Sequence, residues 1–283
     1  MLEGRGLETL SIDHTCFPLE RSDKQSRSAH GSSPSWGESV SLAWKESSAV
    51  AVLSAENGQG LILYCFEPEA RGEKRLGKRL EIHRLLVGRL LRALAELPAS
   101  EGCDGIMAAS QAHDLEVIPG PLGRPLLRVG GRDSLPVSFA HGHGRIWAAL
   151  GLPGFSVGID VAEDTEFPCQ YPFERAFHKQ ELAHVRDLIN GTSSQAAALI
   201  WSAKESVVKA LGCGFHLLDP LDLWVKLTSR NANHLLLSVQ LMSSVEDRRV
   251  HVSGGTLPVR TLQKDGCWLS VCVASLPGPS IGY

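Results

Sequence analysis

The chain has 283 residues, of which 43% are hydrophobic and 21% charged, and its formal net charge is −3. This composition is that of a globular protein, long enough for one large domain or for two halves with cores of their own. It argues against a general nucleic-acid-binding protein, because binding to a phosphate backbone usually needs an excess of basic residues.

The seven cysteines are scattered and form no paired C-x-x-C motif at zinc spacing, which favours a reducing, cytoplasmic compartment. The N-terminus lacks the charged-then-apolar pattern of a signal peptide. No apolar run approaches the roughly 20 residues that a membrane span needs, so we expect no membrane partner. Residues 20–39 are polar and rich in serine, and residues 1–40 are predicted to be a flexible extension.

The predicted elements of the first half begin with two β-like runs and a change of hydrophobic period. The runs are at 48–55 and 60–66, and the period at 71–97 predicts a long, basic amphipathic helix. Short strands are then expected near 104–109, 125–129, 135–140 and 144–150.

The turn "GLPG" near the middle of the chain is taken as the boundary between an N-terminal half, 41–153, and a C-terminal half, 154–283. The elements expected in the second half are a strand at 155–161, helices at 176–190 and 195–211, and strands at 222–228, 234–242, 247–253 and 267–275. Ser193 or Ser194 is expected to cap the second helix. A long helix region and several short strands in each half predict an α+β fold rather than a βαβ alternation.

Two acidic residues lie at unusual places in apolar segments. Asp160 closes the strand "SVGID", where a carboxylate is costly unless it is paired or binds a metal, although it could also be a strand-end cap. Glu205 lies in "WSAKESVVKALG", four residues before Lys209. Taken alone, these two residues form an ordinary helix ion pair that contributes roughly 0.3–0.5 kcal/mol.

Two glycine-containing turns carry basic side chains. Arg124 stands between Gly and Pro in "GPLGRPLL", either as an anion clamp or as a surface turn residue. In "VSFAHGHGRIW" a strand runs into a His-Gly-His-Gly turn, where His141 or His143 could donate to a phosphate. The same turn could be a hairpin with incidental histidines, and a zinc site would need further ligands that are not nearby.

Taken in order, these features resemble the Sfp-type 4′-phosphopantetheinyl transferase family. The family's Gly-(Ile/Val)-Asp motif matches "VGID" at 157–160, and its Trp-x-x-Lys-Glu-x-x-x-Lys motif matches "WSAKESVVK" at 201–209. The acidic residues of the two motifs are 45 positions apart. A Gly-(Lys/Arg)-Pro turn matches Gly123-Arg124-Pro125, and the first-half helix is similar to "HRLLVGRLLRAL" at 83–94.

The resemblance covers roughly residues 48–275 and implies two similar, pseudo-symmetric halves, each with a long helix packed on a small, mostly antiparallel sheet. It implies transfer of the 4′-phosphopantetheine arm of coenzyme A to a serine hydroxyl of an apo acyl or peptidyl carrier protein, with release of adenosine 3′,5′-bisphosphate. Such a reaction needs charge neutralisation on the pyrophosphate and an aligned nucleophile. Mg²⁺, or Mn²⁺ in its place, suits this task. The family also implies a monomer.

The resemblance assigns roles to individual residues. Asp160 and Glu205 correspond to metal ligands, and Glu205 and Lys209 to catalytic groups. The residues expected to contact coenzyme A are Arg124, Pro125, His141, Lys204, Lys209 and Arg84, with Arg89 beside Arg84. Glu181 is expected to position the lysines. The carrier protein is expected to dock near Phe173–Glu181, where basic side chains stand beside aromatic ones.

One position departs from the family pattern. Many members carry a third carboxylate two residues after the Asp, where this chain has Ala162, and Glu163 would face the other side of a regular strand. The metal could keep a water molecule or use another protein oxygen, a bulge could bring Glu163 round, or the enzyme could be weak or inactive. The alternative function is therefore a module that binds coenzyme A or a carrier protein with little or no catalysis. A structural protein with a buried ion pair would leave the ordered motifs unexplained.

Overall fold

The computed structural model describes residues 40–43, 50–54, 61–68, 76–96, 115–230, 234–242, 255–264 and 266–275. Two of the expected strands, 104–109 and 247–253, and the extension before residue 40 lie outside this part of the chain. None of the helices in these ranges is long and apolar enough to cross a membrane.

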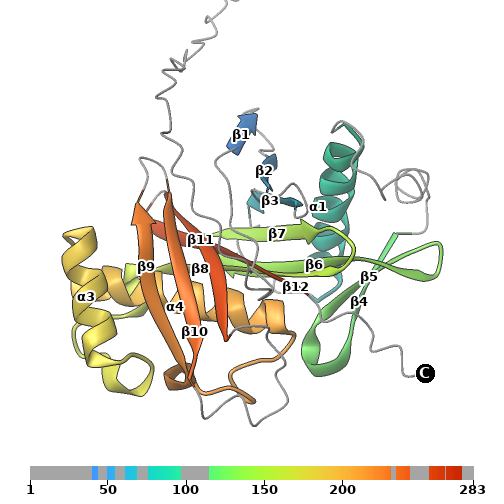
Figure 1. Ribbon diagram of the computed structural model, residues 1–283. Helices are drawn as coiled ribbons and strands as arrows, with labels where there is room; N and C mark the ends of the chain where they lie inside the picture. Colours follow the sequence, from blue (N-terminus) through green and yellow to red (C-terminus); the bar gives the residue numbers. More distant parts are fainter. Residues whose placement is uncertain are drawn as a thin grey trace, which may run out of the picture. The chain divides into compact units, whose positions relative to one another are not determined.

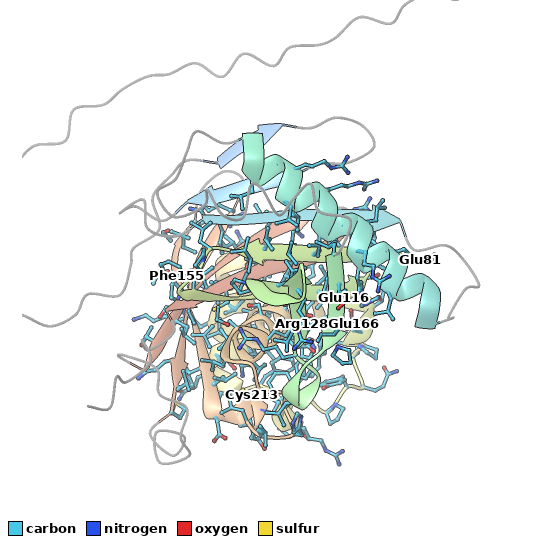
Figure 2. All side chains as sticks on the ribbon, turned by 90° about the vertical axis from the view of Figure 1, so that its right-hand side faces the viewer. Glu81, Glu116, Arg128, Phe155, Glu166 and Cys213 are labelled. Carbon is cyan, nitrogen blue, oxygen red and sulfur yellow. The ribbon has the colours of Figure 1, made fainter. Side chains whose placement is uncertain are left out.

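The first half of the chain builds a seven-stranded antiparallel sheet with the strand order β1-β2-β3-β7-β6-β5-β4. Its strands are β1 (Val40–Ala43), β2 (Val50–Ser54), β3 (Leu61–Pro68), β4 (Leu115–Pro119), β5 (Pro125–Val129), β6 (Arg132–Gly142) and β7 (Arg145–Gly151). Helix α1 (Leu76–Glu96) lies across β3 and β7 (Figure 2) and buries Leu86 and Leu90 against the sheet.

The second half builds a five-stranded antiparallel sheet with the order β8-β12-β11-β10-β9. Its strands are β8 (Phe155–Glu163), β9 (Leu223–Arg230), β10 (Leu235–Leu241), β11 (Thr256–Lys264) and β12 (Cys267–Ser275). Helix α4 (Ser193–Leu211) crosses all five strands, and α3 (Lys179–Ile189) packs on α4 (Figure 1). Four short 3₁₀ turns complete the described elements: η1 (Pro121–Gly123), η2 (Asp164–Glu166), η3 (Phe173–Arg175) and η4 (Pro220–Asp222).

Helix α4 has well-defined ends. The side chain of Thr192 accepts a hydrogen bond from the Gln195 backbone N–H, and Gln195 returns one to the Thr192 backbone, which makes a capping box. The cap is therefore Thr192 and not Ser193 or Ser194, because the helix begins two residues earlier than expected. Gly212 ends it with φ of 71°, a left-handed conformation that glycine adopts without cost.

The two sheets share a layer of buried side chains. Ala140 and Trp147 of the first sheet pack with Ile159 and Val271 of the second in one hydrophobic cluster. The backbone N–H of Ile159 also donates to the Ser138 hydroxyl over 3.1 Å, which links β8 to β6. The fold is the expected α+β type, with two antiparallel sheets that each carry a long helix.

Candidate functional site

One face of β8 lies directly against helix α4. Alternation along the strand turns Ser156, Gly158, Asp160 and Ala162 to this face, while the intervening residues enter the layer between the sheets. A Cβ atom at Gly158 would overlap the Ser206 carbonyl oxygen of α4 and would lie only 2.6 Å from the Ala210 nitrogen. The missing side chain therefore allows the strand and the helix to approach through their backbones.

This close approach brings Asp160 to Lys209 and Glu205. The Lys209 ammonium donates to Asp160 Oδ1 over 2.7 Å and to the Ile159 carbonyl over 3.2 Å. Burial raises the pKa of Asp160 well above its usual value; the Lys209 charge opposes this shift and the Glu205 charge adds to it. Burial lowers the pKa of Lys209, but the charges of Asp160 and Glu205 outweigh it, and this pKa is raised. Two carboxylates and one ammonium thus share a mostly buried site.

The donor set at Asp160 fits a divalent cation. Asp160 is 4% exposed, and its Oδ2 is buried with no hydrogen-bond partner, although a buried carboxylate oxygen normally has one. Within the described ranges, no group of three or more His, Cys, Asp or Glu side chains is placed to hold a metal ion by itself. Mg²⁺ commonly uses one or two carboxylates and takes its other ligands from water and substrate phosphates. Asp160 and Glu205 therefore fit a Mg²⁺ ion that is shared with a phosphate ligand.

The structure tests one interpretation of Ala162, in which a bulge brings Glu163 to the place of the missing carboxylate. Strand β8 pairs with β12 in unbroken register from Phe155 to Glu163, so no bulge turns Glu163 toward Asp160. Glu163 instead accepts a 2.7 Å hydrogen bond from the His143 backbone N–H, and its Oε2 lies 3.5 Å from His143 Nδ1. The bulge interpretation is wrong, because Glu163 holds the β6–β7 turn. Ala162 itself is fully buried in the core.

Glu166, at the end of η2, is a further acid that sequence reasoning missed (Figure 2). Its Oε1 accepts a 2.8 Å hydrogen bond from the Glu163 backbone N–H. Desolvation raises the pKa of Glu166, the Glu163 N–H opposes this, and the charges of Glu163 and Glu205 add to it. Glu166 therefore belongs to the electrostatic surroundings of Glu205. In the sequence, it was one of several acids in the run "EDTE" with nothing to distinguish it.

A cavity of about 420 Å³, within the usual size range of small-molecule sites, is lined in part by Lys209, which contacts Asp160. It is bounded by α1, by the β4–β5 turn, by β6 and by the end of α4 near Cys213. Its basic lining residues are His83, Arg124, His141 and Lys209, which come from both halves of the chain. An apolar wall and four basic groups suit a ligand with a planar apolar part and anionic groups.

Arg124 is held in the wall of this cavity by a hydroxyl group. Its Nη2 donates to Ser156 Oγ over 2.7 Å, and burial lowers the pKa of the guanidinium. In the described part of the chain no carboxylate pairs with Arg124. A guanidinium has five N–H donors, so most of those of Arg124 remain for an anionic ligand.

The aromatic rings of the cavity wall stack on one another. His83 lies parallel to Phe139 with ring centroids 3.9 Å apart, and it meets the His141 ring edge-on at 5.6 Å. Pro125 also lines the cavity. Of the residues expected to contact coenzyme A, Arg124, Pro125, His141 and Lys209 line the cavity. His83 lines it as well, although the sequence had indicated His83 only as part of a helix.

Lys204 requires a correction. It is fully buried, and its ammonium donates to Glu181 Oε2 over 2.9 Å, to the Ala176 carbonyl over 3.0 Å and to the Pro220 carbonyl over 2.9 Å. All three donors are used, so Lys204 has none left for a coenzyme phosphate. Glu181 in turn accepts from the Val225 N–H over 2.6 Å. The pair joins α3, α4 and β9, and Glu181 does position this lysine.

Two further expectations change with the structure. Arg84 lies on the exposed side of α1 and does not line the cavity, where His83 is the α1 residue with a polar side chain.

Phe177 in the expected docking segment is 2% exposed and packs among other aromatic rings, so it offers no apolar docking surface. Arg175 and Lys179 are exposed in the same segment.

The comparison with protein families agrees with this site. A model described as the 4′-phosphopantetheinyl transferase superfamily matches residues 156–258. The matched segment, 103 of the 283 residues, is similar to a domain of that superfamily. This segment begins in β8 and contains Asp160, Glu205 and Lys209, while Arg124 and His141 lie before it. A search of the curated proteins found no match.

Proposed function

We propose that this protein is an Sfp-type enzyme that transfers the 4′-phosphopantetheine arm of coenzyme A to a serine hydroxyl of an apo acyl or peptidyl carrier protein. The other product is adenosine 3′,5′-bisphosphate. The observation that carries the proposal is a basic cavity lined by Lys209, whose ammonium contacts Asp160, a buried carboxylate with no hydrogen-bond partner at Oδ2. We also propose that the enzyme is a cytoplasmic monomer with no nucleic-acid or membrane partner.

The nucleotide portion of coenzyme A is assigned to the cavity. Arg124 and His141 would bind its phosphate groups, since both line the cavity and Arg124 has no acidic partner in the described ranges. The apolar wall around Phe139 provides contact area for a planar base. The pyrophosphate would then lie near Lys209, which lines the same cavity and contacts Asp160.

The reaction is a substitution at phosphorus. Asp160 and Glu205 would hold Mg²⁺ (or Mn²⁺), which when bound supplies positive charge to the pyrophosphate. Lys209 stabilises the charge that develops on the leaving group, because its ammonium lies at the cavity wall. The serine oxygen forms a bond to the phosphorus that carries the pantetheine arm, and the bond from that phosphorus to the bridging anhydride oxygen breaks. The serine proton goes to Glu205, directly or through a water molecule.

The carrier protein is expected to dock through charge. Carrier proteins of this kind are usually acidic around the serine, and Arg175 and Lys179 present exposed positive charge between Phe173 and Glu181. A panel of apo carrier proteins would show whether the carrier belongs to fatty acid, polyketide or nonribosomal peptide synthesis.

Intact-mass measurement tests the proposal. The protein is mixed with coenzyme A, Mg²⁺ and a panel of apo carrier proteins, and the expected result is the mass gain of one phosphopantetheine arm on at least one carrier. Glu205→Gln should abolish the gain. Glu163→Gln is the matched control, since this acid follows Asp160 closely but faces the His143 turn, and it should keep the activity. No gain on any carrier would refute the transferase proposal.

The second candidate is a module that binds coenzyme A or a carrier protein without catalysis. It is favoured by Ala162, because Glu163 does not replace the acid that many family members carry there. The same experiment separates the two candidates when calorimetry is added. Coenzyme A binding without transfer to any carrier would support the binding module, and transfer would refute it.

A further inference from the structure

The hydroxyl of Ser156 joins the two halves of the chain at the cavity. Ser156 is the second residue of β8, is fully buried, and faces α4 as Asp160 does. Its Oγ accepts the 2.7 Å hydrogen bond from Arg124 Nη2 and donates to the carbonyl of Ala210 in the last turn of α4. Arg124 comes from the β4–β5 turn, so a single hydroxyl connects that turn, β8 and α4.

The direction of these two hydrogen bonds is determined by the chemistry of the groups. A guanidinium only donates and a carbonyl only accepts, so the single hydroxyl proton must point to Ala210. Because Ser156 is sealed from solvent, water cannot take the place of either partner. The hydroxyl therefore holds one fixed orientation, and with it the position of Arg124 Nη2.

Gly212 holds the other side of the guanidinium. A Cβ atom at Gly212 would lie 2.9 Å from Arg124 Nη1 and 3.2 Å from Arg124 Cδ, so the arginine lies directly against the end of α4. This end carries the partial negative charge of the helix dipole, which favours a cation there. Arg124 is thus placed by the same helix that carries Glu205 and Lys209.

We propose that Ser156 is a positioning residue for coenzyme A binding, which acts by fixing Arg124 relative to the helix that carries Glu205 and Lys209. This inference rests on the proposed function. Ser156 touches neither the substrate nor the reacting atoms in this assignment. It sets the distance between the basic group that binds the nucleotide and the groups that act on the pyrophosphate.

The test is Ser156→Ala, with calorimetry of coenzyme A and steady-state kinetics on the full chain. The expected result is an increase of about tenfold in Kd and KM for coenzyme A with kcat within about twofold, because one hydrogen bond to a charged group is lost. Ser156→Cys leaves no empty space, although its sulfur is larger than the hydroxyl oxygen, and it is a weak acceptor, so it tests the same hydrogen bond without a cavity.

Ser206→Ala is the matched control. Ser206 is also fully buried, and its hydroxyl donates to the Ala203 carbonyl over 2.8 Å within α4, without contact to Arg124. Ser206→Ala should lower the free energy of unfolding about as much as Ser156→Ala does, but it should keep the affinity for coenzyme A. The double variant with Arg124→Ala and Ser156→Ala should bind no more weakly than Arg124→Ala alone, because Ser156 acts through Arg124.

The outcomes are distinct. Wild-type affinity in both Ser156 variants, or additive losses in the double variant, would overturn the positioning role while leaving the proposed function intact. Failure of the wild-type protein to bind coenzyme A would refute the proposed function, and this inference with it. A tenfold loss that disappears in the Arg124→Ala background would support the inference.

Discussion

Gly158 is the position where a single added methyl group should affect both stability and catalysis. In Gly158→Ala the Cβ atom would lie 2.6 Å from the Ala210 nitrogen and would overlap the Ser206 carbonyl oxygen, both of them backbone atoms of α4. Ordinary contact begins at 3.4 Å, so β8 and α4 would have to separate by at least about 0.8 Å. Overpacking of this kind costs about 1–3 kcal/mol of the free energy of unfolding.

The same separation would move Asp160 away from Glu205 and Lys209, since Asp160 is only two residues farther along β8. A misplacement of about 1 Å can reduce a rate about 100-fold, and we expect a loss of this order in the rate of transfer to the carrier protein. Urea unfolding measures the stability, and intact-mass kinetics with apo carrier protein measure the rate.

Gly88→Ala is the control for this prediction. Gly88 lies within α1 and has no atom within 4 Å of its Cβ position, so the same change should raise the free energy of unfolding by about 1 kcal/mol. If Gly158→Ala were within about 0.5 kcal/mol of the wild-type stability and transferred at the wild-type rate, the argument that backbone contact sets the site would be refuted.

Three other changes test separate parts of the structure. Lys204→Met should lower the free energy of unfolding by about 3 kcal/mol or more in a urea titration, because it leaves the Glu181 carboxylate buried without its cation; near-wild-type stability would contradict the buried ion pair. Thr192→Ala should cost about 1 kcal/mol in the same assay, whereas Ser194→Ala should stay within about 0.5 kcal/mol, and the reverse order would contradict the assigned cap. The increase in Tm caused by Mg²⁺ should grow as the pH rises through the raised pKa of Asp160 and be absent in Asp160→Asn. The pKa of Asp160 is raised in the folded protein, so its contribution to stability falls as pH rises through that pKa, and a bound cation offsets this loss. A Tm increase that does not depend on pH would argue against Asp160 as a ligand.

The local elements of the fold were largely predictable. The strands at 125–129 and 267–275 were predicted to the residue, because both are short apolar runs with clear breaks beside them. The turn after β6 is a two-residue hairpin turn, with left-handed φ angles of 55° at His143 and 62° at Gly144. Strand β11 was missed, because Pro258 lies inside it and proline normally argues against a paired strand.

The part of the candidate site that could be predicted is the part that depends only on the distance between two sequence motifs. Asp160 and the helix with Glu205 were located by the motif distance, and the structure brings Asp160 to Lys209. Lys204 was misassigned because helical periodicity places it at the edge of an apolar face but does not say which segments cover that edge. The groups that cover Lys204 are the Glu181 carboxylate and two backbone carbonyl groups, and they belong to segments distant in the sequence.

The role proposed for Ser156 could not be predicted from the sequence for the same reason. A serine near the start of an apolar strand has no periodic pattern that identifies a role, and its partners are 32 and 54 residues away. Such contacts are properties of the tertiary structure, and only the structure reveals them.

The link between β7 and β8 has a consequence for the chain as a whole. Gly151 ends one strand and Phe155 begins the next, so three residues join the two sheets, and of these Pro153 and Gly154 are exposed. Arg124 stands before this link, and Asp160 stands after it. If the chain were cleaved at the link, neither fragment would hold a complete site, and turnover would depend on the product of the two fragment concentrations. The same three residues would therefore serve as the junction of a split reporter, whose signal measures how often its two fragments meet.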